Sequence, residues 1–550
     1  HKSTDKGLTW ETILTDLTTN DPEKQKQSES GGLTLDATGA ENHCTILVLE
    51  PSPIEKDMIW AASDDGLVHY TTNGGITWTN VSKNIKKLPK GSWITQIKAS
   101  NKNKGEALLI ANDYRRFNYS PYAYRTTNYG KTWERIVDEN DVKTFTYSIV
   151  EDPLNPNLLF LGTDDGLYIS LDSGKNWEKF NSKVFPTVPV KDLIIHPREN
   201  DLIIGTFGRA VWVLDDIRPL REIASNNDVK NSSSIKLFEP PTAYLASYQQ
   251  PTGSRFGADA LYQGENRKSG AMISYYFNPK KEENPKKSES NNPKKTKKDS
   301  IVLNIYNGEK LIRTLKKTSP KKEGVFRWYW NMDEKGVARP SRRASNSNRE
   351  PSGVKVIPGE YKLVLSFKDE KSENIITVES DPRLNFDSNN LKSVYNELKV
   401  LENYMSKAND AIKQLIESKK VLNDYLKLFK NNKSENIKSL NKEIKVEIKN
   451  IDTIVALYLG KEDKRQGIVR NPESTVMTRL RTASSYVGSR KSGLSSTEFR
   501  LVEHAKTELK EALLKTNEFF TKSWTSIKEK ISSENISQFK ETTTIKVDDL

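Results

Sequence analysis

The chain has 550 residues, a mean hydropathy of −0.71, 35% hydrophobic residues and a formal net charge of +13. Its 10 Trp, 21 Tyr and 17 Phe need cores in which to pack, which excludes an intrinsically disordered chain. The basic excess lies outside the tryptophan-rich residues 1–220. A uniformly basic nucleic-acid binder does not have this distribution, so we expect no nucleic-acid partner.

The sequence also excludes a transmembrane helix and a cysteine-based metal site. No apolar run approaches the roughly 18 residues that a membrane span needs. The single cysteine, Cys44, leaves no internal disulfide, and the five histidines lack the i, i+4 spacing of a helical metal site. We therefore expect neither a metal nor a cofactor.

A short motif recurs four times, at residues 3–10, 71–78, 126–133 and 170–177, with the pattern [S/T]-x-[D/N]-x-G-x-[T/N]-W. An Asp or Asn at a tight turn hydrogen-bonds nearby backbone N–H groups, and the Gly supplies a positive φ. The Trp then packs on the returning strand. Each copy therefore predicts a β-hairpin, with a structural role for Asp5, Trp10, Asn73, Trp78, Asn128, Trp133, Asp172 and Trp177.

A second repeat, S/T-D-D-G-L, precedes two of these motifs, at residues 63–67 and 163–167. Residues 205–210 form a degenerate copy, and an enlarged loop at 112–121 occupies the equivalent place in another unit. Each unit therefore reads as strand, DDG turn, strand, second turn, strand. Short strands at a period of about 40–50 residues predict an all-β propeller, with about four blades over residues 1–222, the first one incomplete.

The recurring [D/N]-x-G-x-[T/N]-W motif is similar to the Asp-box (BNR) repeat. Residues 162–177 and 205–216 resemble the C-terminal part of secreted, Bacteroidetes-like bacterial proteins with sortilin-type propellers. This resemblance implies an extracytoplasmic location: secreted, periplasmic or outer-membrane-associated. It does not decide activity, because Asp boxes occur in sialidases, xyloglucanases, sortilins and photosystem assembly factors. Since residues 3–10 fall inside a blade, we expect a missing N-terminal half or another chain to complete the propeller.

The pattern changes after the propeller. Strand-like segments over residues 223–386 predict an immunoglobulin-like β-sandwich, interrupted by a disordered, lysine-rich insertion at 278–300. Apolar residues at a period of 3.6 over 387–530 predict an antiparallel helical bundle, with a break at 431–434. A polar tail follows at 531–550.

The turns between the first and second strands of successive blades are expected to converge near the propeller axis. They carry the candidate ligand-binding residues Asp64, Asp65, Asp113, Arg115, Arg116, Asp164, Asp165 and Arg209. Acids and arginines together suit a glycan or a charged peptide segment. In the alternative, the Asp pairs are turn residues that satisfy backbone N–H groups, the 112–121 loop packs on its own aromatic residues, and Arg209 forms a structural salt bridge to an Asp of a neighbouring blade.

The absence of a catalytic set favours a secreted or cell-surface, non-enzymatic binding or scaffold protein, with a protein partner in a cell-envelope complex. There is no GxSxG, HExxH or P-loop motif, and the arginine triad of a sialidase cannot be assembled. The alternative is a glycoside hydrolase, sialidase-like or xyloglucanase-like, that uses axial carboxylates. A sortilin-like peptide receptor is a third class. Two carboxylates roughly 5–9 Å apart in an axial cleft would favour the hydrolase.

Overall fold

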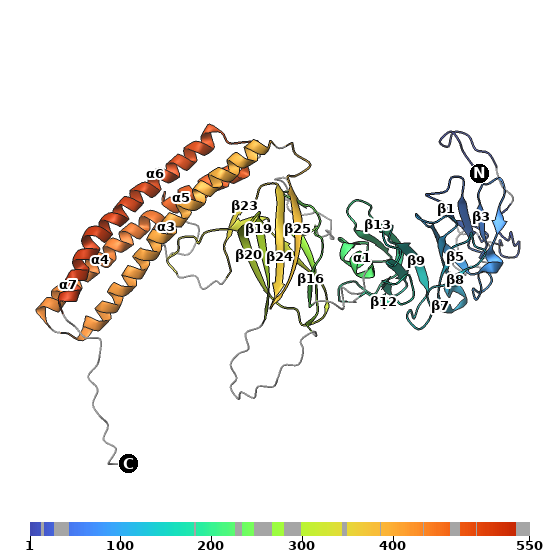
Figure 1. Ribbon diagram of the computed structural model, residues 1–550, viewed down its shortest axis with the longest axis horizontal. Coiled ribbons are helices and arrows are strands. Elements are labelled where there is room, and N and C mark those ends of the chain that lie inside the picture. Colours follow the sequence, from blue (N-terminus) through green and yellow to red (C-terminus); the bar gives the residue numbers. More distant parts are fainter. Residues whose placement is uncertain are drawn as a thin grey trace, which may run out of the picture. The chain divides into compact units, whose positions relative to one another are not determined.

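The computed structural model forms two compact units, His1–Ser233 and Ser234–Leu550 (Figure 1). It describes residues 1–12, 16–26, 43–180, 183–225, 234–246, 267–279, 299–343, 349–385, 387–432, 434–461, 474–490 and 492–534. Among these residues, no helix is both long and apolar enough to cross a membrane.

The described part of the first unit contains four small antiparallel sheets, which follow one another along the chain in the manner of propeller blades. The first sheet consists of β1 (Ile46–Pro51), β2 (Ile59–Ser63), β3 (Val68–Thr71) and β4 (Thr79–Asn80). The second consists of β5 (Trp93–Ala99), β6 (Ala107–Asp113), β7 (Asn118–Thr126) and β8 (Glu134–Arg135). The third consists of β9 (Thr146–Glu151), β10 (Leu159–Thr163), β11 (Gly166–Ser170) and β12 (Glu178–Lys179). The fourth consists of β13 (Val190–Ile195), β14 (Leu202–Thr206) and β15 (Val211–Leu214).

This topology corrects the expected place of the DDG turns. The turns join the second strand of each sheet to the third, because β1, β5, β9 and β13 precede the strands that the repeat identified. These first strands are easily overlooked, since they mix charged and apolar residues, as in β13, whose sequence is VKDLII. They lie next to one another, β1 beside β5, β5 beside β9 and β9 beside β13.

An apolar core lies between each pair of consecutive sheets. Trp60 and Trp133 belong to the core between the first and second sheets, and Ile110 and Leu161 to the core between the second and third. Phe160 belongs to the core between the third and fourth sheets. Side chains that alternate along one strand therefore serve two different cores, which is why the middle strands β6 and β10 are buried on both faces.

The third and fourth sheets approach each other closely at Gly162. A Cβ atom built on this glycine would lie 2.6 Å from the backbone oxygen of Val190 and would also collide with Ser148. Because backbone cannot yield as a flexible side chain does, only glycine fits at this point of β10.

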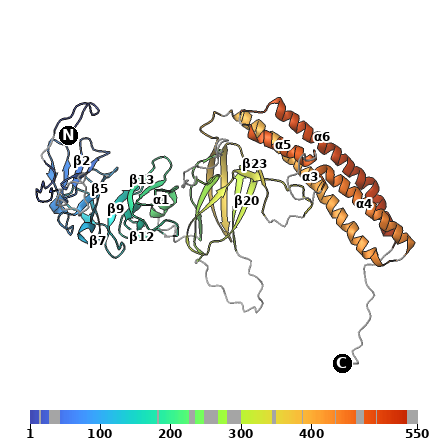
Figure 2. The ribbon, with the colours of Figure 1, turned by 180° about the vertical axis from the view of Figure 1, so that it is seen from behind.

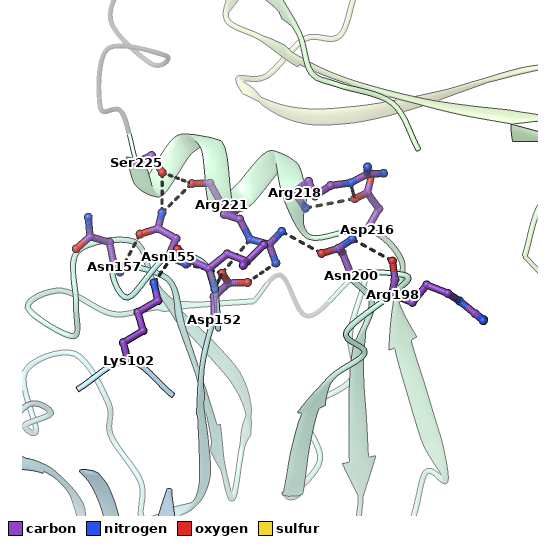
Figure 3. A network of polar contacts seen from close by, with 11 residues as sticks. Lys102, Asp152, Asn155, Asn157, Arg198, Asn200, Asp216, Arg218, Arg221 and Ser225 are labelled. Carbon is purple, nitrogen blue, oxygen red and sulfur yellow. Dashed lines mark hydrogen bonds and ion pairs between the residues drawn. The ribbon is translucent and has the colours of Figure 1, made fainter. Parts of the chain in front are cut away.

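A short helix, α1 (Arg218–Ser225), follows the last sheet and is fastened to the third by polar contacts (Figure 3). Arg221 donates to both carboxylate oxygens of Asp152, at 2.8 and 2.6 Å, and to the side chain of Asn200 at 3.0 Å. The amide of Asn155 donates to the Arg221 carbonyl and to the hydroxyl of Ser225, both at 2.9 Å. Because Leu220 and Ala224 of the helix also pack in the apolar core between the third and fourth sheets, the helix covers one end of that core.

The second unit begins with two sheets that share one apolar core. One sheet has the order β16 (Ile235–Leu237), β18 (Ala271–Phe277), β21 (Gly324–Trp330). The other has the order β17 (Ala243–Tyr244), β25 (Glu370–Glu379), β24 (Gly359–Phe367), β19 (Ser300–Asn307), β20 (Lys310–Thr318). A two-stranded ribbon of β22 (Asp333–Lys335) and β23 (Ser352–Lys355) adjoins them.

The predicted insertion at 278–300 is described only at its ends, and residues 280–298 lie outside the described residues. Asn278 is buried and its backbone N–H donates to the Ser234 oxygen at 2.9 Å, while Ser300 already belongs to β19. The predicted boundaries were therefore too wide.

The predicted C-terminal helical region is confirmed. It consists of α3 (Ser388–Leu428), α4 (Glu435–Leu459), α5 (Val476–Ser489), α6 (Ser496–Phe519) and α7 (Thr525–Ser533). The helices are interrupted between α3 and α4, where the sequence predicted a break. A π-helical turn, η6 (Phe520–Trp524), joins α6 to α7. Figures 1 and 2 both show α3, α4 and α6 side by side around a common core. Most of the predicted polar tail, residues 535–550, lies outside the described residues.

Candidate functional site

The Asp-box side chains are occupied within their own turns. Asp5, Asn73, Asn128 and Asp172 each accept a hydrogen bond from the backbone N–H four residues later, at 2.9–3.0 Å. The preceding Ser or Thr hydroxyl accepts from the glycine N–H of the same box, as between Gly7 and Ser3 at 2.7 Å. These groups shape the hairpins and leave little capacity for a ligand.

The four box tryptophans differ in their surroundings. Trp133 and Trp177 are buried, with 8% and 6% of their surface exposed, and Trp78 is half-buried. Trp10 is 63% exposed, in a hairpin where Lys2 and Glu11 form an isolated backbone bridge. Burial of these rings therefore depends on the sheet that each of them meets.

Asp64 and Asp65, two of the predicted ligand residues, turn into the protein. Asp64 accepts from the Thr45 backbone N–H at 2.8 Å, and Asp65 accepts from the Thr19 N–H at 2.5 Å and from the Ser63 hydroxyl. Burial raises the pKa of Asp64. Burial acts in the same direction on Asp65, but the hydrogen bonds from Ser63 and Thr19 outweigh it and lower its pKa. Both carboxylates therefore accept backbone N–H groups from other segments of the chain, and Asp65 also accepts from the Ser63 hydroxyl of its own turn.

Asp113 and Arg116 pair with each other. Arg116 Nε lies 2.6 Å from the Asp113 carboxylate, which is buried and also accepts from Asn118 at 3.1 Å. Asp165 is likewise engaged, with Lys179 Nζ at 2.7 Å and the Thr163 hydroxyl at 2.8 Å. These residues hold the turns between the second and third strands in shape.

The structure brings Arg115 and Asp164 to one place, together with side chains that the sequence did not single out. We call this group the aromatic–cationic cluster; it consists of Trp93, Tyr114, Arg115, Phe145, Tyr147, Asp164 and Lys191. The guanidinium carbon of Arg115 lies 3.3 Å from the centroid of the Trp93 ring and 4.5 Å from that of Tyr114. Tyr114 in turn stacks on Phe145, with centroids 4.7 Å apart.

Lys191 supplies the second cation of the cluster. Its Nζ lies 3.2 Å from the Tyr147 ring centroid, and the Tyr147 hydroxyl lies 3.4 Å from Asp164. Burial lowers the pKa of Lys191 and the charge of Arg115 lowers it further, whereas Asp164 works against both. Burial, together with the Asp164 carboxylate, raises the pKa of Tyr147. The cluster therefore gathers two cations and one carboxylate on a floor of aromatic rings.

Three consecutive sheets contribute to this cluster. Trp93, Tyr114 and Arg115 come from the second sheet and its turn, Tyr147 from the third and Lys191 from the fourth. The turns converge because each of them packs against the start of the first strand of its sheet. The backbone N–H of Asp64, of Asp164 and of Phe207 donates to the carbonyl oxygen of the residue just before that strand. Arg209, at the exposed tip of the last of these turns, is not in the cluster.

Trp93, Tyr147 and Lys191 were missed because each lies at the start of a first strand that the repeat did not mark. A signal was present, since Phe145 and Tyr147 alternate toward one face directly before an apolar run. Among the described residues, no group of three or more His, Cys, Asp or Glu side chains could hold a metal ion.

Part of the chain is similar in sequence to a known family. Residues 121–235 match the Sortilin-Vps10 family, described as sortilin, neurotensin receptor 3. The human VPS10 domain-containing receptor SorCS1 is 29% identical over 86 residues, which span 15% of this chain and 7% of that receptor. The residues that match this family include the third and fourth blade-like sheets.

The solved structures that resemble the chain include β-propeller proteins. An ancestral GH74 enzyme is 19% identical, with a TM-score of 0.25 over 30% of this chain and 22% of that enzyme. YCF48 from Cyanidioschyzon merolae is 14% identical, with a TM-score of 0.22 over 42% of this chain and 66% of its own.

Proposed function

We propose that the first unit is a receptor-like, non-enzymatic binding module, and that the aromatic–cationic cluster recognises acidic segments of a partner protein. The observation that carries the proposal is the pairing of Arg115 and Lys191 over aromatic rings, with Asp164 as the one carboxylate of the cluster. A carboxylate placed between the cations would gain two charge-assisted contacts, and the rings would exclude water from them. The Sortilin-Vps10 region supports a receptor-like role.

Binding of a fluorescent glutamate-rich peptide tests this proposal. We expect Arg115→Gln and Lys191→Gln each to weaken binding about tenfold or more, and added salt to weaken it further. Arg198→Gln is a matched control, because this exposed arginine of the first unit lies outside the cluster. Arg116 is unsuitable as a test position, since its removal would leave the buried Asp113 carboxylate without its cation. Normal binding by both cluster variants would refute the proposal, and preference for an acidic oligosaccharide over the peptide would assign the cluster to glycans.

We propose further that another propeller blade, on a separate polypeptide, packs on the outer face of the fourth sheet. In the third sheet, Val150, Phe160 and Ile169 form a row across three strands that packs onto the fourth. The equivalent row of the fourth sheet is Ile194, Ile203 and Val213, in which the two outer residues are each 53% exposed. Since the same face is covered in one sheet and open in the next, an additional blade is the matching partner.

A charge placed in this row tests the docking of a blade. Wild-type chain is expected to retain, from an extract of the source cells, a protein that mass spectrometry shows to contain Asp-box repeats. Val213→Asp should abolish this capture without lowering the melting temperature, because the side chain is exposed. The docking would be refuted if Val213→Asp still captured the same protein, or if wild-type chain captured only proteins without Asp-box repeats.

The proposal also covers the second unit and the cellular location. We propose that its two sheets form an immunoglobulin-like sandwich, which together with the helices acts as a scaffold in an extracytoplasmic complex of the cell envelope. Fractionation of the source cells tests the location, and recovery in the cytoplasm would refute it.

One observation favours glycoside hydrolysis as a second candidate function. Glu50, Glu106 and Glu151 line a cavity of about 430 Å³ at the ends of the first strands. Burial raises the pKa of Glu50 and of Glu151, although Lys98 and Arg125 respectively oppose the shift. A raised pKa suits a general acid. Hydrolysis of xyloglucan or a sialoside that is lost in Glu151→Gln would support this function, and no hydrolysis of either by wild-type chain would reject it.

A further inference from the structure

The second unit contains a cavity of about 580 Å³ between α3, α5 and the segment that carries β22 and β23. This volume falls within the range of small-molecule binding sites. The apolar part of its wall includes Met332, Val354 and Val356 from the segment with β22 and β23, and Leu391, Val394 and Leu398 from α3. The α3 residues of this set share one helix face, because they recur every three or four positions.

The cavity exists because α5 contributes only small side chains to it, Ser484 and Gly488. A Cβ atom on Gly488 would meet a single neighbour within 4 Å, Leu398 Cδ2 at 4.0 Å. Glycine is unfavourable inside a helix, and interiors otherwise pack closely. A glycine that keeps a space open between two helices therefore suggests that the space is used.

The polar groups of the wall are mostly paired. The Tyr395 hydroxyl donates to Glu334 at 2.5 Å, and Lys399 Nζ lies 3.1 Å from the other oxygen of Glu334 and also contacts Glu402. Arg490 Nε lies 2.9 Å from Glu498. These contacts fix α3 against β22 and fix the end of α5, so they shape the cavity.

Arg339 differs from these groups. It lines the cavity and is itself exposed, which places it at the mouth. Within the described part of the chain it forms no ion pair or hydrogen bond. Lys355 also lines the cavity and is exposed, but its Nζ already donates to the Asn331 carbonyl. The site therefore combines an apolar interior with cations at its wall, of which Arg339 is the one without a hydrogen bond or ion pair among the described residues.

We propose that this cavity binds an anionic amphiphile, a molecule with a carboxylate and a hydrocarbon chain. The chain would lie along Leu391, Val394 and Leu398, and the carboxylate would face Arg339. Burial of the hydrocarbon supplies the affinity, and the guanidinium selects the charge of the head group. The site belongs to the second unit and is independent of the peptide site proposed above.

Titration calorimetry of the full chain with dodecanoate, below its micelle concentration, tests the charge selection. We expect saturable binding of one dodecanoate, and at least tenfold weaker binding of dodecyltrimethylammonium, which has the same tail and the opposite charge. Arg339→Gln should weaken dodecanoate binding about tenfold. Arg500→Gln, an exposed arginine on α6 outside the cavity, should leave it unchanged.

Two variants that fill the cavity from opposite walls test its location. In Val394→Trp the new side chain enters the cavity from α3, and in Gly488→Leu it enters from α5. Each variant should lose dodecanoate binding while its circular dichroism spectrum shows an intact fold. If one of them unfolds, the other decides. No saturable binding by wild-type chain, equal binding of the cationic amphiphile, or full binding by a folded cavity-filled variant would each overturn the proposal.

Discussion

The Asp-box tryptophans show how one local motif serves different environments. The turn around each tryptophan is made by bonds spanning at most four residues, so the motif alone predicts it. The burial of the tryptophan ring, in contrast, depends on what packs against the turn. Trp133 meets Trp60 of the preceding sheet, with centroids 5.9 Å apart, whereas Trp10 is largely exposed. The sequence identifies the turn and leaves the neighbouring sheet undetermined.

We therefore expect unequal effects from the same substitution in two boxes. Trp133→Ala should lower the free energy of unfolding by about 3–5 kcal/mol, because it opens a cavity between the first two sheets. Trp10→Ala should change it by less than about 0.5 kcal/mol, since the ring is mostly in water. Urea unfolding followed by circular dichroism measures both. Similar losses in the two variants would mean that the motif itself, rather than its neighbour, sets the stability.

At the scale of elements, helix α1 depends on a buried ion pair. The Asp152 side chain is fully buried and its two oxygens both accept from Arg221 (Figure 3). Arg221→Ala should lower the free energy of unfolding by about 3–5 kcal/mol, because a buried carboxylate is left without its partner. Arg198→Ala is the matched control, since Arg198 is 82% exposed and its pair with Glu199 should contribute about 0–1 kcal/mol. Urea unfolding of both variants shows whether the Arg221–Asp152 pair contributes more to stability than an exposed ion pair does.

Helix α6 begins with a capping box that makes stability depend on pH. Ser495 accepts from the first turn of the helix, and Glu498 reaches back to accept from the Ser495 hydroxyl and backbone N–H. These bonds, together with Arg490, lower the pKa of Glu498 to about 2. An unfolded glutamate titrates near about 4.3. The ionised form is therefore favoured by folding, and its contribution is complete above about pH 4.3 and lost as the pH falls toward 2.

The test is the pH dependence of unfolding in wild-type chain and in Glu498→Gln. Between about pH 5 and pH 2, the midpoint of thermal unfolding of the helices should fall more steeply in wild type than in the variant. The two midpoints should run parallel above about pH 5. Parallel curves across the whole range would show that Glu498 does not carry this dependence.

The elements of the helical region were predictable because their apolar residues recur at the helical period. The break predicted at 431–434, where the residues are polar, separates α3, which ends at Leu428, from α4, which begins at Glu435. The π-helical turn in the last helix has no such signal, since residues 520–524 contain neither Gly nor Pro. At this turn Phe519, Phe520 and Trp524 pack on one another, with ring centroids 5.2–6.4 Å apart.

At the scale of the whole molecule, the order of the structural types was predictable and the candidate site was only half predictable. Arg115 and Asp164 could be proposed because they lie in repeated turns. Trp93 and Lys191 could not, because they join the cluster only through the packing of three sheets, and no local pattern records which strand starts face one another.

The largest consequence of this organisation is that the two units should unfold separately. Each apolar core that the described residues form lies wholly within one unit: three among the blade-like sheets, one between the two sheets of the second unit and one among the helices. Cooperative unfolding requires a shared core, so calorimetry should resolve at least two transitions. Gly162→Ala should lower the temperature of one of them, because its Cβ would collide with the Val190 backbone oxygen. Leu415 lies in the fully buried core of the helices. Leu415→Ala should lower the free energy of unfolding by about 2–5 kcal/mol, and it should lower the temperature of a different transition from the one that Gly162→Ala affects. If either substitution shifted every transition by a similar amount, the two units would have to be energetically coupled.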